Sequence, residues 1–321
     1  MKLGVFMVAL GNQRFEEALK TLSEKGVQSV EIGTGGYPGN SHCNPSEFLA
    51  DPAKIQDMKD VLEKYNLSVS ALSFHGNPVH PNKELAEQFH EDFQNSVLLA
   101  EKLGVDTVVT FSGCPGGSKR DRVPNWITCP WPPDFIEALD YQWKKVLIPY
   151  WKKAARFARE HGVSKIALEM HPGMSVYNPE TLLKLRAAAG PEIGVNFDPS
   201  HLYWQGIDPV AAIYELRDCM FHFHAKDTKI NELKSKVNGV LDTKHYADEI
   251  NRSWLFRSIG YGHDEAHWKD MMSMLRMIGY DGAISIEHED SLLSNMEGLG
   301  RAIEMLQRVL IFEPVGEMFW A

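Results

Sequence analysis

The feature that most constrains the fold is a regular alternation between short runs rich in β-branched residues and stretches with helical periodicity. Eight strand–helix pairs of this kind follow one another along the 321 residues. The expected strands are residues 3–8, 29–32, 68–74, 107–111, 165–170, 193–197, 220–224 and 283–288. The expected helices are residues 14–25, 52–65, 83–103, 133–161, 179–189, 209–217, 265–278 and 292–310.

Strands that alternate with helices are joined by right-handed crossovers and lie parallel in one sheet. Eight such units, without a second block of different composition, favour a closed barrel over an open doubly wound sheet. We therefore expect an α/β protein with a single domain, a (β/α)8 or TIM barrel that spans residues 1–321.

Two segments exceed what a minimal barrel needs. One lies near residues 112–133 and is dense in Gly, Pro and Trp, and the other lies near residues 229–262. Each follows the carboxyl end of an expected strand, and long loops at that end are often functional. Two interpretations stay open: an added surface or oligomer contact, and a lid whose Trp126 and Trp131 shield a substrate.

Composition narrows the partners and the cell compartment. The chain has 33 basic and 43 acidic residues, a net charge of -10, which argues against nucleic acid as a partner. No apolar run reaches the roughly 18 residues of a membrane span, and the amino terminus lacks a signal-peptide core. Four cysteines without a CxxC pair are typical of a reduced protein, so a cytoplasmic location is expected.

Ionisable residues gather where the last four expected strands end. Each of these strand ends offers one candidate metal ligand, and the four candidates are Glu169, Asp198, His224 and Glu287. In a barrel these positions face one mouth, where several unpaired carboxylates would repel and raise one another's pKa. A divalent cation removes that conflict, and oxygen with nitrogen ligands suits Mn²⁺, Mg²⁺, Co²⁺, Fe²⁺ or Zn²⁺. Of these ions we expect Mn²⁺. We therefore predict that these four residues bind one divalent metal ion.

Each of these assignments has a simpler alternative. A single carboxylate at a strand end is more often a helix cap or an ion-pair partner. His222 shares a strand face with His224 and competes with it as a ligand, as Glu289 competes with Glu287. His224 is preferred because it lies nearer the carboxyl end, and Glu287 because it directly follows the apolar strand.

Five segments then identify a family resemblance. In chain order they are ALEMHP (167–172), NFDPSH (196–201), HFHAKD (222–227), FRSIGYGH (256–263) and ISIEHED (284–290). The ordered set resembles the xylose isomerase-like sugar phosphate isomerase/epimerase superfamily over essentially the whole chain. That superfamily also contains ketose 3-epimerases, inosose dehydratases and endonuclease IV.

The resemblance implies roles for individual residues. Glu169, Asp198, His224 and Glu287 match the four metal ligands, and Glu169 with Glu287 matches the pair that moves protons in the ketose 3-epimerases. His201 resembles a residue that hydrogen-bonds substrate oxygens, and Arg257 is similar to a substrate-binding arginine.

Three further residues are candidates for the substrate site, of which Trp126 lies in a loop outside the family pattern. His75 resembles another substrate contact, with a buried, hydrogen-bonded histidine as the alternative. Lys226 has either a substrate role or an ordinary ion pair with Asp227. Trp126, in the first insertion, is expected to stack on a sugar or on an aromatic aglycone.

The reaction implied is metal-assisted proton transfer. A glutamate removes a proton next to a carbonyl, and the resulting enediolate is stabilised by the cation. Return of a proton gives epimerisation or isomerisation of a small carbohydrate substrate. Loss of a β-substituent instead gives a lyase or dehydratase acting on a keto-glycoside or inosose, as in the large subunit of a C-glycoside deglycosidase. The extra histidines and carboxylates that bind three zinc ions in endonuclease IV are not found as a full set in this sequence. The protein is also a candidate homo-oligomer.

Overall fold

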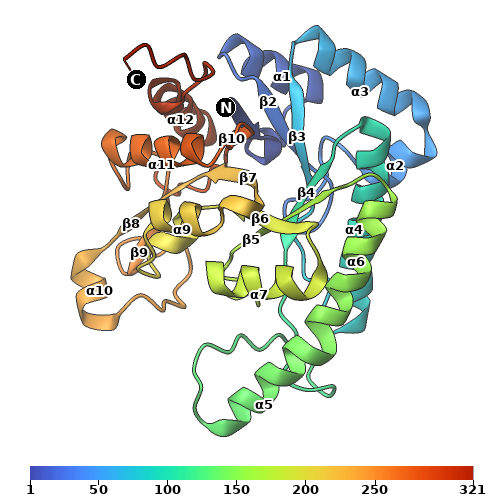
Figure 1. Cartoon of the computed structure of the whole chain (residues 1–321), viewed down its shortest axis with the longest axis vertical. Helices are drawn as coiled ribbons and strands as arrows, with labels where there is room; N and C mark the ends of the chain where they lie inside the picture. The colour runs from blue at the N-terminus through green and yellow to red at the C-terminus, as the bar shows by residue number, and fades with distance from the viewer. Residues whose placement is uncertain (321) are drawn as a thin grey trace.

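Eight parallel strands close into a barrel in the order β1-β10-β7-β6-β5-β4-β3-β2, which confirms the expected fold (Figure 1). The computed structural model describes residues 1–320. The barrel strands are β1 (Lys2–Phe6), β2 (Ser29–Gly33), β3 (Ser68–Ser73), β4 (Thr107–Phe111), β5 (Lys165–Glu169), β6 (Ile193–Phe197), β7 (Met220–Ala225) and β10 (Ala283–Ile286).

Helices cover the outside of this barrel. The long helices that follow the strands are α1 (Phe15–Glu24), α3 (Pro52–Lys64), α4 (Lys83–Leu103), α6 (Ile148–Glu160), α7 (Pro179–Ala189), α9 (Pro209–Glu215), α11 (Glu265–Met277) and α12 (Asn295–Val309). Short elements that the periodicity did not predict are η1 (Met7–Leu10), α2 (Pro45–Ala50), α8 (Ser200–Tyr203) and η3 (Arg217–Cys219). Because helices bury one face of each strand and the barrel interior buries the other, strands such as β2, β4 and β6 are buried throughout.

The single helix expected over residues 133–161 is divided into three parts. These are α5 (Pro133–Tyr141), the π-helical turn η2 (Gln142–Leu147) and α6. Pro149 near the start of α6 has no backbone N–H to donate to the preceding turn, which gives a physical reason for the irregular hydrogen bonding there.

The barrel interior has an apolar floor and a polar layer above it. Ala71, Val109 and Ala167 form a small buried cluster against the ring of Phe221. Gly194 is required there, because a Cβ at this position would lie 2.2 Å from a ring carbon of Phe221. The small floor residues therefore make room for one aromatic ring, and that ring closes the barrel below the polar residues of the mouth.

The second insertion contains regular structure where a polar loop was expected. Asp227–Ile230 (β8) pairs antiparallel with Trp254–Arg257 (β9), and α10 (Glu232–Asn238) lies between them. Trp254 and Phe256 of β9 form a buried cluster with Trp204, which explains why the segment is ordered as a hairpin. The first insertion differs, since residues 112–132 contain neither helix nor strand. The hairpin projects to one side of the barrel, beyond α9 (Figure 1).

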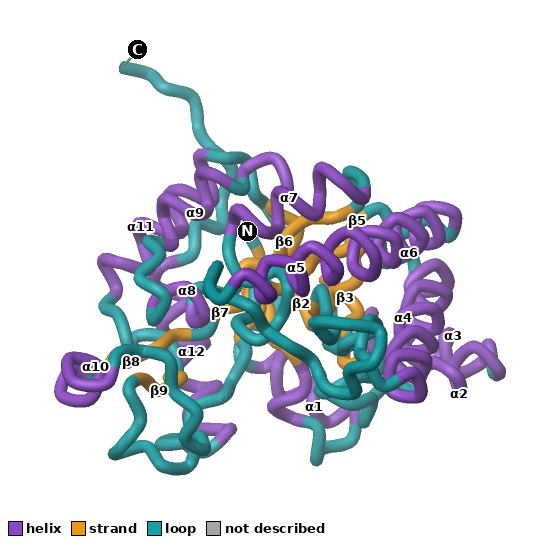
Figure 2. Tube along the Cα trace, turned by 90° about the horizontal axis from the view of Figure 1, so that it is seen from below, coloured by secondary structure: helices purple, strands orange, loops and turns teal. Residues whose placement is uncertain are grey.

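The chain continues beyond α12 as a segment that runs away from the barrel (Figure 2). Within residues 1–320, no helix is both long enough and apolar enough to cross a membrane.

Candidate metal centre and active site

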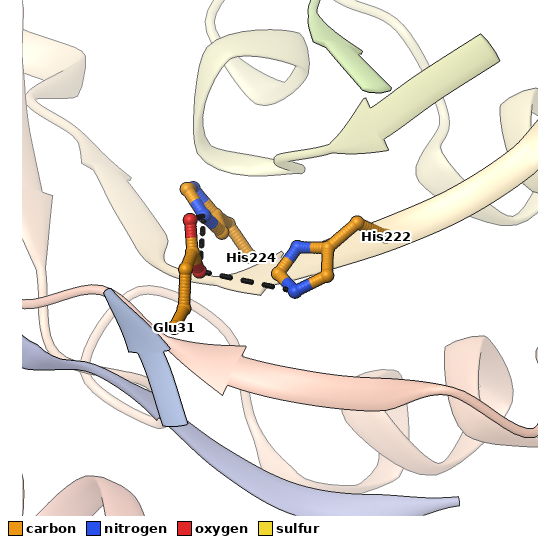
Figure 3. A group of neighbouring side chains, drawn as sticks. All are labelled: Glu31, His222 and His224. Carbon is orange, nitrogen blue, oxygen red and sulfur yellow. Dashed lines mark hydrogen bonds and ion pairs between the residues drawn. The ribbon is translucent and has the colours of Figure 1, made fainter. Parts of the chain in front are cut away.

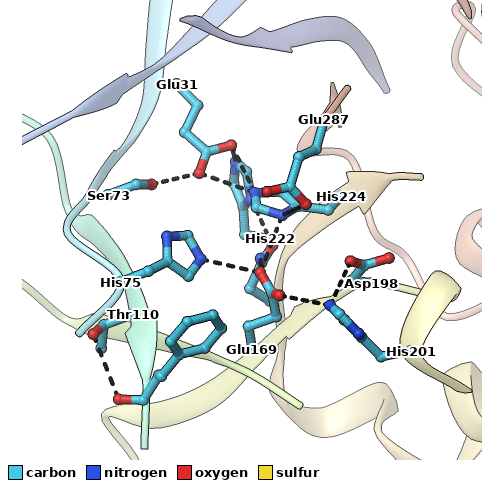
Figure 4. Close-up of polar contacts among 12 residues, drawn as sticks. Glu31, Ser73, His75, Thr110, Glu169, Asp198, His201, His222, His224 and Glu287 are labelled. Atoms are coloured by element: carbon cyan, nitrogen blue, oxygen red, sulfur yellow. Dashed lines mark hydrogen bonds and ion pairs between the residues drawn. The ribbon is translucent and has the colours of Figure 1, made fainter. Parts of the chain in front are cut away.

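The four predicted ligands lie together at the carboxyl end of the barrel (Figure 4). Glu169 is the last residue of β5, Asp198 follows β6, His224 lies near the end of β7 and Glu287 follows β10. One potential ligand atom from each side chain lies within 4.8 Å of the other three. The parallel strands thus bring together residues that are up to 118 positions apart in the sequence.

Two buried atoms in this group have no hydrogen-bond partner among the described residues. They are Nδ1 of His224 and Oδ2 of Asp198, although Oδ2 also forms ion pairs with Lys226 Nζ at 3.0 Å and His201 Nε2 at 3.2 Å. His224 Nδ1 lies 3.2 Å from Oε2 of Glu169 and 3.2 Å from Oε2 of Glu287. A ring nitrogen so close to two carboxylates needs a positive charge between them, which either a proton or a metal ion supplies. The four side chains together therefore fit a divalent cation.

The carboxylates of the site are ionised, as metal ligands must be. Burial alone would lower the pKa of His224, but the charges of Glu31 and Glu287 outweigh burial and hold that pKa well above its ordinary value. Burial would raise the pKa of Glu287, but Lys226 and His224 lower it to about 2. The pKa of Asp198 is also held below its ordinary range, against burial, by Lys226 and His201. The carboxylates therefore stay ionised.

Glu31, which was not among the residues predicted from the sequence, holds His224 by the ring nitrogen that faces away from the other proposed ligands (Figure 3). His224 Nε2 donates to Glu31, whose two carboxylate oxygens both lie 2.9 Å away. Ser285 Oγ, at 2.7 Å, and Ser73 Oγ also donate to Glu31. This leaves the lone pair of His224 Nδ1 facing the other ligands, as metal-binding histidines require.

His222 belongs to the hydrogen-bond network below the site. Its Nδ1 lies 2.9 Å from Oδ1 of Asn196 and its Nε2 lies 3.1 Å from Oγ of Ser70. Burial lowers the pKa of His222 to about 4, so the ring is neutral at pH 7. Because both ring nitrogens are hydrogen-bonded, the geometry favours His224 over His222 as a ligand.

Three donors surround Glu169. His75 Nε2 lies 3.0 Å from Oε2, Asn196 Nδ2 lies 3.0 Å from the same oxygen, and His201 Nε2 lies 3.1 Å from Oε1. Burial would lower the pKa of His201, but Asp198 raises it to about 9. The two histidines that were expected to bind substrate therefore also hold a proposed metal ligand in place.

Lys226 points into the mouth and has no ion pair with Asp227. Its Nζ lies 2.7 Å from Glu287, 2.9 Å from Glu289 and 3.0 Å from Asp198. Asp227 instead accepts hydrogen bonds from the backbone amides of the loop before α11. The structure therefore contradicts the simple Lys226–Asp227 pair and leaves the substrate role as a proposal.

These side chains surround a cavity of about 180 Å³, which we call the metal chamber. It is lined by His75, Glu169, His201, Lys226 and Glu287, and also by Tyr37, Phe111, His171 and Glu289, which the sequence interpretation did not select.

The remaining predicted residues lie elsewhere. Trp126 lines a neighbouring cavity of about 330 Å³ with Trp204 and Trp254. Arg257 donates from Nε to Asp290 at 3.0 Å and does not line either cavity. Trp131 is 74% exposed and lines neither cavity.

A family model described as xylose isomerase-like TIM barrel matches residues 19–309. The chain belongs to this family. Among curated relatives of this xylose isomerase-like barrel, the uncharacterized protein YfiH of Bacillus subtilis is 41% identical over 312 residues, which cover 97% of this chain and 99% of YfiH. An inosose dehydratase of Mesomycoplasma hyopneumoniae is 26% identical over 230 residues, 70% of this chain and 67% of that protein.

Solved structures show the same fold at lower identity. The probable 3-DHS dehydratase AsbF of Bacillus anthracis has a TM-score of 0.66 at 15% identity and covers 96% of this chain, with 99% of AsbF matched. The IOLI protein, solved with a bound zinc atom, has a TM-score of 0.65 at 19% identity over 97% of this chain and 98% of IOLI.

Proposed function

We propose that this protein is a divalent-metal-dependent isomerase or epimerase of a small, sugar-like hydroxy-ketone, with Mn²⁺ as the first choice of ion. The observation that supports this proposal is the group of four potential ligand atoms, all within 4.8 Å of one another, at the carboxyl end of the barrel. A cation bound by these residues would polarise a substrate carbonyl and acidify the adjacent C–H bond.

Glu287 is the better placed of the two glutamates to accept that proton. Its side chain is 16% exposed and lines the metal chamber, whereas the side chain of Glu169 is only 2% exposed and is hydrogen-bonded by three donors. Donors on both oxygens make a carboxylate a weaker base. Glu287 therefore takes the proton, and Glu169 stays ionised as a ligand. Return of a proton to the opposite face, as epimerisation requires, would need Glu169 to take up a proton of its own first.

Lys226 supports this transfer from within the chamber. Its ammonium group, 2.7 Å from Glu287, keeps that carboxylate ionised before the transfer, although it also weakens it as a base, and it can donate a hydrogen bond to a substrate oxygen. His75 and His201, which line the same chamber, supply further donors for substrate hydroxyls.

The test is solvent deuterium uptake. With Mn²⁺ and a panel of ketohexoses and inososes in deuterated water, the wild-type protein should place deuterium next to the carbonyl of at least one compound. Glu287→Gln should lower that rate by at least about 100-fold, the usual contribution of a positioned base. Glu215→Gln, at an exposed glutamate that ends α9, is the matched control and should exchange at the wild-type rate. Exchange by Glu287→Gln at the wild-type rate would rule out this role.

A dehydratase is the second candidate, because the 26% identical relative is an inosose dehydratase. Both reactions begin with the same proton removal, and Lys226 offers a buried acid for a departing hydroxyl group. Mass spectrometry of the product separates the two. An isomer or epimer keeps the substrate's composition apart from deuterium, whereas a dehydratase product is lighter by one water. A C-glycoside lyase with a partner subunit, a homo-oligomer and a cytoplasmic location remain predictions.

A further inference from the structure

A second, larger cavity opens directly from the metal chamber. It has a volume of about 510 Å³, and we call it the outer chamber. Most of its wall is apolar, and its main residues are Tyr37, Phe111, Met174, Tyr246, Leu255 and Phe256.

The two chambers share walls and so form one continuous site. Tyr37, Phe111, His171 and Glu289 line both of them. The ring of Phe111 lies between histidines of the mouth, with its centroid 4.7 Å from that of His75 and 4.8 Å from that of His171. A ligand held in the metal chamber therefore has the outer chamber beside it.

The two chambers suit different chemistry. The metal chamber, at about 180 Å³, is lined by carboxylate, ammonium and imidazole groups of the proposed catalytic end, beside apolar residues such as Phe6, Val8 and Phe111. It is smaller than the roughly 300–1,000 Å³ of most ligand sites. The outer chamber falls within that range and offers mainly aromatic and aliphatic surface, with Glu289 and Ser291 among its few polar groups. A free monosaccharide there would bury hydroxyl groups without partners, which is costly.

The second insertion builds much of this apolar wall. Leu255 and Phe256 come from β9, and Tyr246 comes from the loop before it. The rings of Tyr246 and Phe256 are stacked with centroids 5.6 Å apart. Since β9 and this loop are not part of the eight-stranded barrel, the insertion has added an aromatic surface beside the proposed catalytic centre.

We propose that the natural substrate is a conjugate, with a sugar-like ring in the metal chamber and an aromatic substituent in the outer chamber. This inference rests on the proposed function, because it places the reacting ring at the metal centre. A flat aromatic group can stack on Tyr37, Phe111 or Phe256, and its edge can reach the polar groups of Glu289 and Ser291.

The test compares two simple probes for binding to the full-length protein with Mn²⁺. Phenyl β-D-glucopyranoside and methyl β-D-glucopyranoside carry the same sugar and differ only in the substituent. Burial of the phenyl ring should make the phenyl compound bind about tenfold more tightly by isothermal titration calorimetry. Equal affinity, weaker binding of the phenyl compound, or no measurable binding of either would overturn the inference.

Variants locate the effect in the outer chamber. Leu255→Trp fills the chamber and should remove the preference for the phenyl compound, measured as the ratio of the two affinities. Leu233→Trp is the matched control, because Leu233 lies in the same insertion, on α10, and is 82% exposed. Tyr246→Ala, at a half-exposed side chain, should weaken phenyl glucoside binding severalfold and serves as a second variant if Leu255→Trp does not fold. An unchanged preference in the folded variants would contradict the proposed location.

This binding readout is independent of turnover. A wild-type protein that prefers phenyl glucoside but never exchanges deuterium would contradict the proposed reaction, while the proposed role of the outer chamber would stand. Deuterium exchange without a phenyl preference would contradict the proposal that the substrate carries an aromatic substituent, while the proposed reaction would stand.

Discussion

His224 can offer a metal ion only one of its two ring nitrogens, and Glu31 determines which one. The carboxylate of Glu31 accepts from Nε2, so Nδ1 is left to face Glu169 and Glu287. Such carboxylate–histidine pairs orient the ring and make the ligand nitrogen more basic. One side chain on β2 thus controls a ligand on β7, across the interior of the barrel (Figure 3).

We predict that Glu31→Gln weakens Mn²⁺ binding by about tenfold, because the amide can still accept from His224 but no longer carries a charge. Glu192→Gln is the matched control, since Glu192 is also buried but pairs with Arg159, outside the metal group. Competition titration with a metal-chelating dye measures both affinities. Equal affinity for Glu31→Gln and wild type would show that Glu31 has no influence on the ion.

The sequence predicted the four proposed ligands, which the structure brings together, but not the residues that support them. Glu169, Asp198, His224 and Glu287 stand out because each follows or ends an apolar strand. Glu31 carries a similar signal, as a charged residue within the buried strand SVEIG. Its strand, β2, is not adjacent in the barrel to any strand that carries a proposed ligand. Its contact with His224, 193 positions away, depends on barrel closure and side-chain direction, which periodicity does not specify.

At the level of elements, the β8–β9 hairpin depends on a buried carboxylate for its attachment to the barrel. Oδ2 of Asp290 accepts from Arg257 Nε at 3.0 Å and from the Ser258 amide at 2.8 Å, and Oδ1 accepts from the Leu292 amide at 2.9 Å. Burial would raise the pKa of Asp290, but these donors outweigh it and hold the pKa below its ordinary value. The structure therefore gives Arg257 an anchoring role.

We predict that Asp290→Asn lowers the free energy of unfolding at pH 7 by about 1–3 kcal/mol, the cost of weakening a buried hydrogen-bonded group. Because the folded pKa lies below the unfolded one, the contribution of Asp290 is present above about pH 4 and is lost as the pH falls further. Urea unfolding at pH 7 and pH 3 measures the difference from wild type, which should shrink at pH 3. Asp57→Asn, at an exposed position on α3, should stay within about 0.5 kcal/mol of wild type at both pH values. If Asp290→Asn lowered the free energy of unfolding by the same amount at pH 7 and at pH 3, ionisation of Asp290 would not contribute to stability as proposed.

Periodicity predicted the barrel elements well and the hairpin poorly. Expected and observed strands differ by at most two residues at their ends, as 165–170 against Lys165–Glu169 shows. The strands β8 and β9 have four residues each and pair across 23 intervening residues, so their local signal is weak. Packing of Trp254 and Phe256 on Trp204, a tertiary contact, decides their structure.

On the scale of the whole molecule, the proposed ion would join four of the eight barrel strands through residues on or next to β5, β6, β7 and β10, which are adjacent in the barrel. A ligand that binds only the folded state stabilises it, by about 2.7 kcal/mol when its concentration is 100 times its Kd.

Closure of the barrel could be predicted from the eight repeated strand–helix units. The substrate and the oligomeric state could not, because they depend on surfaces that the repeat does not encode.

We predict that saturating Mn²⁺ raises the Tm of the wild-type protein by a few degrees and that EDTA reverses the change. Asp198→Asn should abolish the rise, because it removes the negative charge of one of the four proposed ligands. Asp57→Asn is again the control and should show the full rise. Differential scanning fluorimetry with and without the ion gives the answer, and an equal rise in Asp198→Asn would place the stabilising ion elsewhere.

The most direct test of the metal centre is an anomalous difference map from a crystal grown with Mn²⁺. We expect one strong peak per chain, in contact with Glu169, Asp198, His224 and Glu287. A peak between Glu31 and His222, or no peak in the barrel mouth, would contradict the proposed centre and the chemistry assigned to it.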